Sequence, residues 1–498
     1  MERNDQARPG LTSTHVAAGP LGQPRGLATL FLTEMWERFS YYGMRSILVL
    51  YLVTAVHEGG FGFDDRTASA VYGLYIAATY VFALLGGWIA DRLLGAQRAI
   101  LLGGVFITAG NALLLAGPGN IFFIGLLVIV LGVGLLKPNI SVLVGNLYPE
   151  GGARRDAGFS IFYLGISVGA LLGSLLVPLA VASFGWRYAF ALPVVGMVFG
   201  LAQFLLTRRR LAPAPPRETR AGLSAWMPVL IFVGVLLVMI LLTLTHRVAL
   251  EPVRVAAASS WVIALCAVAY FAYLILFAGL SAAERARVVV MAVLFAAYAA
   301  FFAGFEQGGA SMNLFAERYT DRHLLGWVMP AGVLQGTTAL VTILFAPVFA
   351  ALWLALGRRG RDPSPPLKFA IGLTLLGLGT LVMVVASRLV VAGAIVAPTW
   401  LLLTYLLQEW GDLCLAPVGL STMTKLAPSR YVGQVMGLWF LAIALGNNLA
   451  GQLSEEYDAT DLASLPHLFS KIAVWSFACA AVMLLLTPIM KRLMGGVR

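Results

Sequence analysis

Long apolar runs, separated by short stretches rich in glycine, proline and charged residues, follow one another along almost the whole chain. A helix crosses a bilayer with about 20 mostly apolar residues. The runs lack the alternating pattern of membrane β-barrel strands, so they predict an all-α polytopic membrane protein. Fourteen transmembrane helices are expected, at residues 28–56, 67–91, 97–117, 120–147, 157–183, 187–207, 224–245, 257–280, 287–316, 323–356, 368–388, 391–426, 431–453 and 468–490.

The longest polar interruption between these runs divides the chain into two parts. Residues 208–222 carry five arginines and three prolines, which predicts a cytoplasmic linker after six spans. Two related bundles that rock about a central site are typical of transporters. The expected organisation is a disordered cytoplasmic tail at 1–26, an N-terminal six-helix bundle at 27–207, the linker at 208–222, an additional two-helix hairpin at 223–285 and a C-terminal six-helix bundle at 286–498.

Composition excludes the soluble classes of protein. Of the 498 residues, 60% are hydrophobic and 11% are charged, against about 25% charged in a soluble globular chain. Soluble enzymes and nucleic-acid binders are excluded, and the net charge of +11 is explained by basic cytoplasmic loops. With a cytoplasmic start, 23 Lys and Arg residues fall in inner segments and 8 in outer loops, so both termini are expected in the cytoplasm.

The cysteines and histidines indicate neither a disulfide framework nor a metal centre. Cys266, Cys414 and Cys479 all lie in apolar segments. The five histidines sit in or beside expected loops, without the spacing of metal ligands. No metal or cofactor is therefore expected.

Charged residues inside the predicted spans are the main functional signal. Each one costs about 2.5 to 3.5 kcal/mol at the centre of a bilayer, so it needs a partner, water or a function. We expect them to face a shared watery cavity, with an ion cluster that only locks helices together as the alternative. Five acids oppose three bases, and protonation would relieve the negative excess, which suggests proton coupling. The eight residues are Glu34, Glu37, Arg38, Arg45, Lys137, Glu306, Glu409 and Asp412.

Two local patterns strengthen this interpretation. The polar residues of the first span repeat at helical spacing, which places them on one face. Lys137 precedes Pro138, which leaves a backbone acceptor exposed at membrane depth. The alternative is a lysine that extends to the headgroups, but nine residues, 139–147, continue the span beyond Pro138.

Six short motifs are spread along the chain. Residues 34–43, EMWERFSYYG, fit the pattern ExxERFxYYG at every specified position. The others are GGWIADR at 86–92, GLLKPN at 134–139, FEQG at 305–308, PVGLS at 417–421 and GLWF at 437–440. With these motifs the chain resembles the proton-dependent oligopeptide transporter (POT/PTR2) family, bacterial type, of the major facilitator superfamily.

The resemblance implies a fold and an activity. The fold would be that of the major facilitator superfamily, with two six-helix bundles and an additional two-helix hairpin. The activity would be import of di- and tripeptides with protons, by alternating access, through a monomer in the bacterial inner membrane. A proton-coupled carrier of nitrate, a drug or a modified amino acid on the same fold is the alternative. A membrane-embedded enzyme and a channel are less favoured, because no nucleophile and base are clustered and the opposite charges lie in separate halves.

The resemblance also implies a substrate site. Arg38 and Lys137 would attract the peptide carboxylate, and Trp439 would wall a side-chain pocket, with plain packing as its alternative role. Tyr72 and Tyr75 are alternatives to Tyr80, since they lie in the same predicted span. The implied substrate-binding residues are Arg38, Tyr42, Tyr80, Lys137, Ser167, Glu306, Glu409, Asp412 and Trp439.

Proton coupling and gating follow from the same resemblance. The proton-coupling residues would be Glu34, Glu37, Lys137 and Glu306. An outer gate would pair Arg45 with Glu306, and an inner gate would pair Lys137 with Asp412.

Three positions depart from the family pattern. Ser167 and Thr338 stand where the family has asparagine, so a shorter hydroxyl replaces an amide donor. Asp412 stands where the family has glutamate, one methylene longer. Glu409 lies three residues earlier on nearly the same helix face, and we expect it to restore the reach to the peptide amino group.

Overall fold

The computed structural model describes most of the chain. Its described parts are residues 23–148, 152–211, 251–324, 326–428, 431–457 and 461–495, with the single residues 227 and 234. Most of the expected tail at 1–26, most of the expected linker at 208–222 and nearly all of the predicted span at 224–245 lie outside the described residues.

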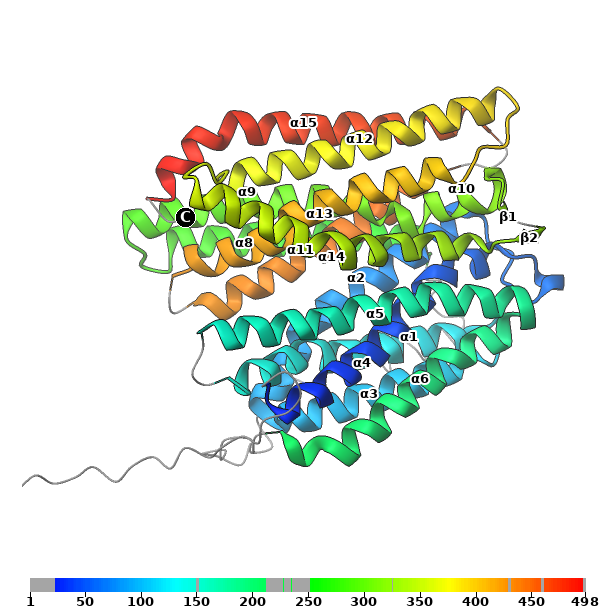
Figure 1. The fold of residues 1–498 in the computed structure, drawn as a ribbon, viewed down its shortest axis with the longest axis horizontal. Helices are drawn as coiled ribbons and strands as arrows, with labels where there is room; N and C mark the ends of the chain where they lie inside the picture. Colours follow the sequence, from blue (N-terminus) through cyan, green and yellow to red (C-terminus); the bar gives the residue numbers. More distant parts are fainter. Residues whose placement is uncertain are drawn as a thin grey trace, which may run out of the picture.

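Six long helices occupy the first part of the chain. They are α1 (Arg25–Val53), α2 (Asp65–Ile89), α3 (Ala96–Leu114), α4 (Asn120–Asn146), α5 (Gly152–Phe184) and α6 (Trp186–Thr207). Short 3-10 turns at Val56–Glu58 and Arg208–Arg210 and a π-helical turn at Ala90–Leu94 lie between or after them. Helix α1 packs against α5 and α6, and α3 packs against α4 and α6, so these helices share one core. Figure 1 shows them together, coloured from blue to green.

The second part of the chain is also helical, with one small β-hairpin. Its helices are α8 (Pro252–Leu276), α9 (Ala282–Phe305), α10 (Ser311–Tyr319), α11 (Gly336–Arg358), α12 (Pro365–Val391), α13 (Thr399–Leu426), α14 (Val432–Ser454) and α15 (Ser464–Leu493). Strands β1 (His323–Leu324) and β2 (Trp327–Val328) pair antiparallel. Helix α12 packs against α13 and α15, and α14 packs against α9 and α8. These helices lie on the other side of the molecule (Figure 1).

Ten helices in the described parts of the chain are long and apolar enough to cross a membrane. Helices α1 and α13 are not among the ten, and they carry the charged residues Glu34, Glu37, Arg38, Arg45, Glu409 and Asp412. The molecule is therefore an almost entirely helical protein with many apolar helices and with charge concentrated in a few of them.

Three predicted spans differ from the observed helices. The span at 287–316 lies within one helical stretch long enough to cross a membrane, Ala282–Tyr319, but this stretch is divided into α9 and α10 by a 3-10 turn at Glu306–Gly309, where two adjacent glycines weaken the helix. The span at 323–356 begins too early, since α11 starts only at Gly336, after the β-hairpin and a 3-10 turn at Ala331–Gln335. The span at 391–426 also begins too early, because α13 starts at Thr399 directly after a proline.

The predicted boundary between residues 285 and 286 falls inside the first turn of α9. That helix begins with a capping box, in which the Ser281 hydroxyl accepts from the Glu284 backbone N–H and the Glu284 carboxylate accepts from the Ser281 backbone N–H. Reciprocal bonds of this kind satisfy two otherwise unpaired donors and fix the start of a helix.

Contacts between the two parts of the chain position the site. Helix α2 packs along α14, α5 packs against α11, and α1 touches α10. The α2 and α14 backbones approach closely at Gly73 and Gly451, where a Cβ added to Gly73 would lie 2.9 Å from the Gly451 Cα. Glycine is needed there because any side chain would push the two helices apart.

Candidate functional site: a polar cavity between the two groups of helices

A cavity of about 110 Å³ lies between helices of both parts of the chain. Helices α1, α2 and α5 contribute one wall, and α9, α11 and α13 contribute the other. The lining residues are Tyr41, Tyr42, Arg45, Tyr80, Tyr163, Ile166, Ser167, Ala170, Phe302, Phe305, Glu306, Thr338, Ala339, Thr342, Glu409 and Asp412.

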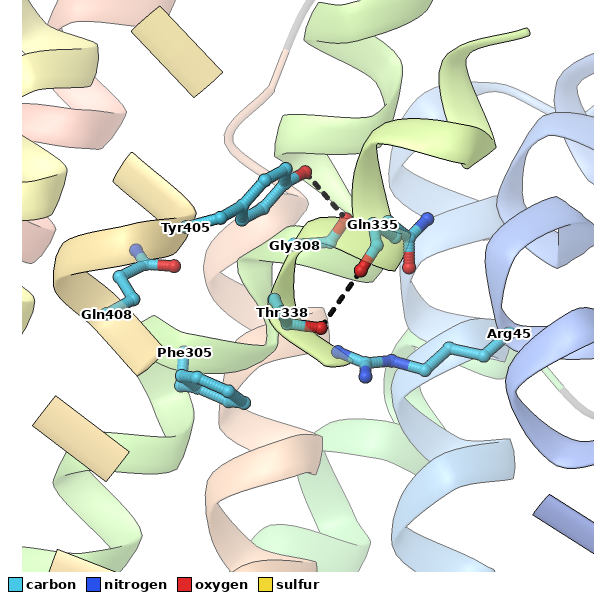
Figure 2. Close-up of a pocket in the computed structure, with 7 residues that line it drawn as sticks. All are labelled: Arg45, Phe305, Gly308, Gln335, Thr338, Tyr405 and Gln408. Atoms are coloured by element: carbon cyan, nitrogen blue, oxygen red, sulfur yellow. Dashed lines mark hydrogen bonds between the residues drawn. The ribbon is translucent and has the colours of Figure 1, made fainter. Parts of the chain in front are cut away.

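A smaller recess adjoins this cavity. The two spaces share Arg45, Phe305 and Thr338, and the recess continues between Tyr405 and Gln408 of α13 (Figure 2). The Arg45 guanidinium therefore lies at the junction of both spaces.

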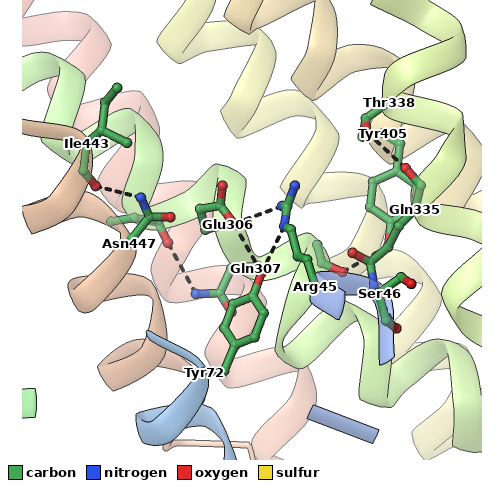
Figure 3. Close-up of polar contacts among 12 residues, drawn as sticks. Arg45, Ser46, Tyr72, Glu306, Gln307, Gln335, Thr338, Tyr405, Ile443 and Asn447 are labelled. Atoms are coloured by element: carbon green, nitrogen blue, oxygen red, sulfur yellow. Dashed lines mark hydrogen bonds and ion pairs between the residues drawn. The ribbon is translucent and has the colours of Figure 1, made fainter. Parts of the chain in front are cut away.

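Arg45 of α1 and Glu306, at the break between α9 and α10, form an ion pair across the two groups of helices. Arg45 Nη2 lies 2.8 Å from Glu306 Oε2, and both side chains are buried. Tyr72 of α2 completes the contact: its hydroxyl accepts from Arg45 Nε at 2.9 Å and donates to Glu306 at 3.2 Å (Figure 3). One buried cluster thus connects α1, α2 and the broken helix.

Gln307 holds the broken turn next to Glu306 in place. Its Nε2 donates to the Ala450 carbonyl of α14 at 3.0 Å, and its Oε1 accepts from the hydroxyls of Ser311 and Ser454 at 2.5 and 2.7 Å. Because an interrupted helix leaves backbone groups without intrahelical partners, side chains must replace them. The Gly308 and Gly309 pair breaks the helix, and Gln307 fixes the break against α14.

The charged residues at the start of the first motif form a compact cluster. Arg38 Nε lies 3.2 Å from Glu34 Oε1 and also bonds the Glu37 carboxylate. Three of the cluster's polar atoms, Glu34 Oε2, Glu37 Oε1 and Arg38 Nη2, are buried without a hydrogen-bond partner. The Arg38 guanidinium lies 4.9 Å from the centre of the Tyr41 ring, and Tyr41 lines the cavity. The cluster is thus separated from the cavity by one aromatic ring.

Lys137 of α4 contacts aromatic rings rather than carboxylates. Its Nζ lies 3.8 Å from the centre of the Tyr80 ring and 6.0 Å from that of Tyr41. Within the described chain, neither Lys137 nor Asp412 takes part in an ion pair, and Asp412 Oδ1 is buried without a partner. The expected Lys137 and Asp412 gate pair is therefore not formed in this structure, whereas the Arg45 and Glu306 pair is formed.

Glu409 and Asp412, one turn apart on α13, both line the cavity. The Thr342 hydroxyl of α11 donates to the Glu409 carboxylate. The Arg45 guanidinium of α1 and the two carboxylates of α13 thus line the same cavity from opposite walls. Opposite charges at separated positions suit a ligand that carries both signs.

The remaining predicted substrate residues fall into two groups. Tyr42, Tyr80 and Ser167 line the cavity together with Thr338. Arg38, Lys137 and Trp439 lie outside its lining. Trp439 is buried and stacks on Tyr298, with 3.8 Å between ring centres.

Sequence reasoning missed several residues of the site. Tyr72 was named only as an alternative to Tyr80, although it joins the Arg45 and Glu306 pair. Thr342 lies one turn after Thr338, a spacing that places both on one helix face and could have identified it. Gln408 could not be identified from its predicted neighbour Glu409, because adjacent residues of a helix point in different directions.

The fold and the cavity define the class of the molecule. It is a multi-pass helical membrane protein with a buried polar chamber between two groups of helices. The chain belongs to the POT family, whose PTR2 model matches residues 97–468.

Individual relatives resemble the whole chain. It is 41% identical to the peptide transporter YePEPT of Yersinia enterocolitica, covering 97% of this chain and 98% of the relative. It is 34% identical to a di-/tripeptide transporter of Lactococcus lactis subsp. lactis, over 96% of this chain and 98% of the relative. Among solved structures, it superposes on a mutant of peptide transporter POT in complex with alafosfalin with a TM-score of 0.86, at 38% identity and over 96% and 97% of the two chains.

Proposed function

We propose that this protein imports di- and tripeptides together with protons, by alternating access of one cavity to the two sides of a membrane. Relatives that match almost its entire length are named peptide or di-/tripeptide transporters. The single observation that carries the proposal is the cavity between the two groups of helices, with Arg45 on one wall and Glu409 and Asp412 on the other. A zwitterionic peptide matches that separation of charge.

The gates are proposed to alternate. The Arg45 and Glu306 pair closes one end of the cavity, while Lys137 and Asp412 stand apart at the other. In our proposal a peptide carboxylate is attracted by Arg38 and Lys137 as these side chains turn toward the cavity. Tyr42, Tyr80 and Ser167 supply hydroxyls for the peptide, and Trp439 supports the wall of a side-chain pocket.

Proton coupling is assigned to the buried carboxylates. Glu34, Glu37 and Asp412 each have a buried oxygen without a partner, which a proton could satisfy. A carboxylate that gains a proton loses its charge and its ion pair, so protonation can release a gate. Glu34, Glu37, Lys137 and Glu306 are the proposed coupling residues, and no cofactor besides the proton is required.

The proposed topology extends the described helices. We propose fourteen transmembrane helices in the arrangement of the major facilitator superfamily, with bundles at 27–207 and 286–498, a linker at 208–222 and the additional hairpin at 223–285. Both termini would face the cytoplasm of a bacterium whose inner membrane holds the protein as a functional monomer. The excess of Lys and Arg in the assigned inner segments supports this orientation. As a transporter, the protein is proposed to move its cargo without chemical conversion.

Uptake into proteoliposomes tests the proposal. Labelled dialanine should accumulate when an inward proton gradient is imposed, and a protonophore should abolish the accumulation. Unlabelled di- and tripeptides should compete for uptake, whereas free alanine should not. Protein-free liposomes are the control.

Two results would change the conclusion. Dialanine uptake of equal extent with and without the gradient would remove proton coupling. Competition by nitrate, a drug or a modified amino acid, with none by peptides, would favour another cargo on the same fold.

A further inference from the structure

The start of α2 is tied to both α14 and α10 by ion pairs. Arg66 Nε lies 3.2 Å from Oε2 of Glu455, the residue that follows the last residue of α14. The neighbouring Asp65 accepts from both terminal nitrogens of Arg318, near the end of α10, at 2.7 Å. We call these two ion pairs the α2 latch. It joins the two groups of helices at one end of the molecule.

The α2 latch lies beyond the Arg45 and Glu306 pair as seen from the cavity. Along α2, Arg66 comes first, Tyr72 of the buried cluster follows, and Tyr80 of the cavity lining comes last. At 1.5 Å per residue, Arg66 and Tyr72 are about 9 Å apart along the helix axis. The latch therefore closes the same end of the protein as the buried pair, but nearer to its surface.

The two pairs of the latch use their carboxylates differently. Each oxygen of Asp65 is bonded to a terminal nitrogen of Arg318. Glu455 bonds through Oε2, whereas its Oε1 is buried and has no hydrogen-bond partner among the described residues. A buried carboxylate oxygen without a partner is costly, and a proton on the carboxyl group would remove the charge. The Arg66 side chain is 63% exposed, so water can solvate it when the pair is broken.

The surroundings of Glu455 show what a proton there would compete with. Burial raises the pKa of Glu455 above its ordinary value, although the contact with Arg66 acts to lower it. The carboxylate is therefore charged and paired at higher pH, and it loses the pair as the pH falls through the raised value. The other charged or titratable groups at this end of α2, α8, α10, α14 and α15 have contacts of their own: Asp64 with Thr67, Asp65 with Arg318, Tyr457 with Arg318, Glu251 with Arg254, and Glu456 with Lys471.

We propose that Glu455 is a proton-binding site at this end of the protein, and that its protonation releases Arg66 so that α2 can move away from α14. The inference goes beyond the proposed function, because Glu455 lies outside the cavity and outside the proposed coupling residues. In the proposed topology the start of α2 faces the outside of the cell. Acid on that side then loosens the end through which the peptide enters.

Distances between spin labels test the proposal without any transport. Val56→Cys, in the turn before α2, and Ile395→Cys, between α12 and α13, give label sites that are 69% and 73% exposed. The full chain is used, with Cys266, Cys414 and Cys479 replaced by alanine. Between about pH 8 and about pH 4.5, a range above the ordinary glutamate pKa of about 4.3, the long-distance population should rise about 2- to 5-fold, as expected for one partly exposed ion pair.

Glu455→Gln keeps the shape of the side chain and carries no charge at any pH. It should show the enlarged long-distance population already at about pH 8 and should change little on acidification. All other titratable groups are the same in the two proteins, so the difference between them reports Glu455. Arg66→Gln removes the other partner of the pair and should behave like Glu455→Gln.

Glu456→Gln is the matched control, since Glu456 is the next residue and pairs with Lys471 of α15 within the second group of helices. It should keep the wild-type distances at both pH values. Wild-type distances that do not change with pH, acidification that moves Glu455→Gln as far as the wild type, or an equal shift in Glu456→Gln would each overturn the proposal. A wild type that shows the expected shift but does not accumulate dialanine would remove the proposed function and still support the proton site at Glu455.

Discussion

The Arg45 guanidinium on α1 and the Glu306 carboxylate at the break between α9 and α10 lie 2.8 Å apart and join the two groups of helices inside the protein. Both are buried, and Tyr72 bonds to each. A buried pair of this kind is costly to break on one side only, because the remaining charge is left without a partner. The pair thus stabilises the arrangement in which the cavity is closed at the end where Arg45 and Glu306 meet.

Breaking this pair on one side should destabilise the protein more than removing both charges. Arg45→Gln and Glu306→Gln should each lower the free energy of unfolding by about 3 to 5 kcal/mol, and the double variant should lower it by less than either single change. Thermal unfolding in detergent measures the cycle, and all three variants should lose dialanine uptake. Additive effects of the two single changes would show that the charges do not interact.

Glu409 should be required for uptake. Its carboxylate faces the cavity one turn from Asp412 and is held by the Thr342 hydroxyl. Glu409→Gln removes the charge without changing the shape, and dialanine uptake should fall about 10-fold or more, as expected for a charge-assisted hydrogen bond of about 1.5 to 3 kcal/mol. Glu317→Gln is the matched control, since the exposed Glu317 on α10 pairs with Arg322 just after that helix. Unchanged uptake in Glu409→Gln would remove its role at the peptide amino group.

A second link between the two groups of helices is a bidentate pair. Both terminal nitrogens of Arg318 on α10 lie 2.7 Å from the carboxylate oxygens of Asp65 on α2. The pair is partly exposed, so it contributes at most about 1 kcal/mol. Asp65→Asn should raise by about 2- to 5-fold the population of molecules in which α2 and α10 have moved apart at this pair.

Spin labels measure this population. Glu58, with an exposed side chain, and Leu462, which is 38% exposed, lie in loops of the two groups of helices and are suitable label sites. Distance distributions between them should shift to longer values in Asp65→Asn. Asp321→Asn is the control, since Asp321 pairs with His323 inside one loop. Equal distance distributions for the wild type and Asp65→Asn would show that the pair does not hold α2 and α10 together.

The N-terminus of α2 should make stability depend on pH. Asp64 accepts from the Thr67 backbone N–H at 2.9 Å and from its hydroxyl at 2.8 Å. Partial burial acts to raise the pKa of Asp64, but these hydrogen bonds outweigh it and lower the pKa below its ordinary value. A lowered pKa in the folded state gives stability that is present above the ordinary pKa of about 3.9 and is lost as the pH falls through the lowered value.

Asp64→Ala should therefore lower the free energy of unfolding by about 1 kcal/mol at neutral pH. Its difference from the wild type should shrink as the pH falls below about 4. Thermal unfolding midpoints at several pH values measure this change. Asp64→Asn retains a capping side chain without a titrating group, so its stability should vary less over this range. If the stability difference between Asp64→Ala and the wild type stayed the same at all pH values, the Asp64 charge would be excluded as the source of the stabilisation.

The sequence by itself determined the class of the molecule. Apolar runs of membrane length and the unusual charges within them predicted a helical membrane protein with a polar interior, and the motif at 34–43 indicated the family. These features are local, because length, hydropathy and spacing along one helix can be read without knowing its neighbours. The break in the span at 287–316 escaped prediction, since only contacts from Gln307 to α14 make the interrupted helix stable.

Only the tertiary structure decided which of these charges meet. It joined Arg45 to Glu306 directly and through Tyr72, and it set Lys137 against an aromatic ring. Partners of this kind are separated by up to hundreds of residues, and their distances depend on how whole helices pack. A pattern along one helix fixes the face on which a side chain lies, while the neighbouring helix that it meets is fixed by packing.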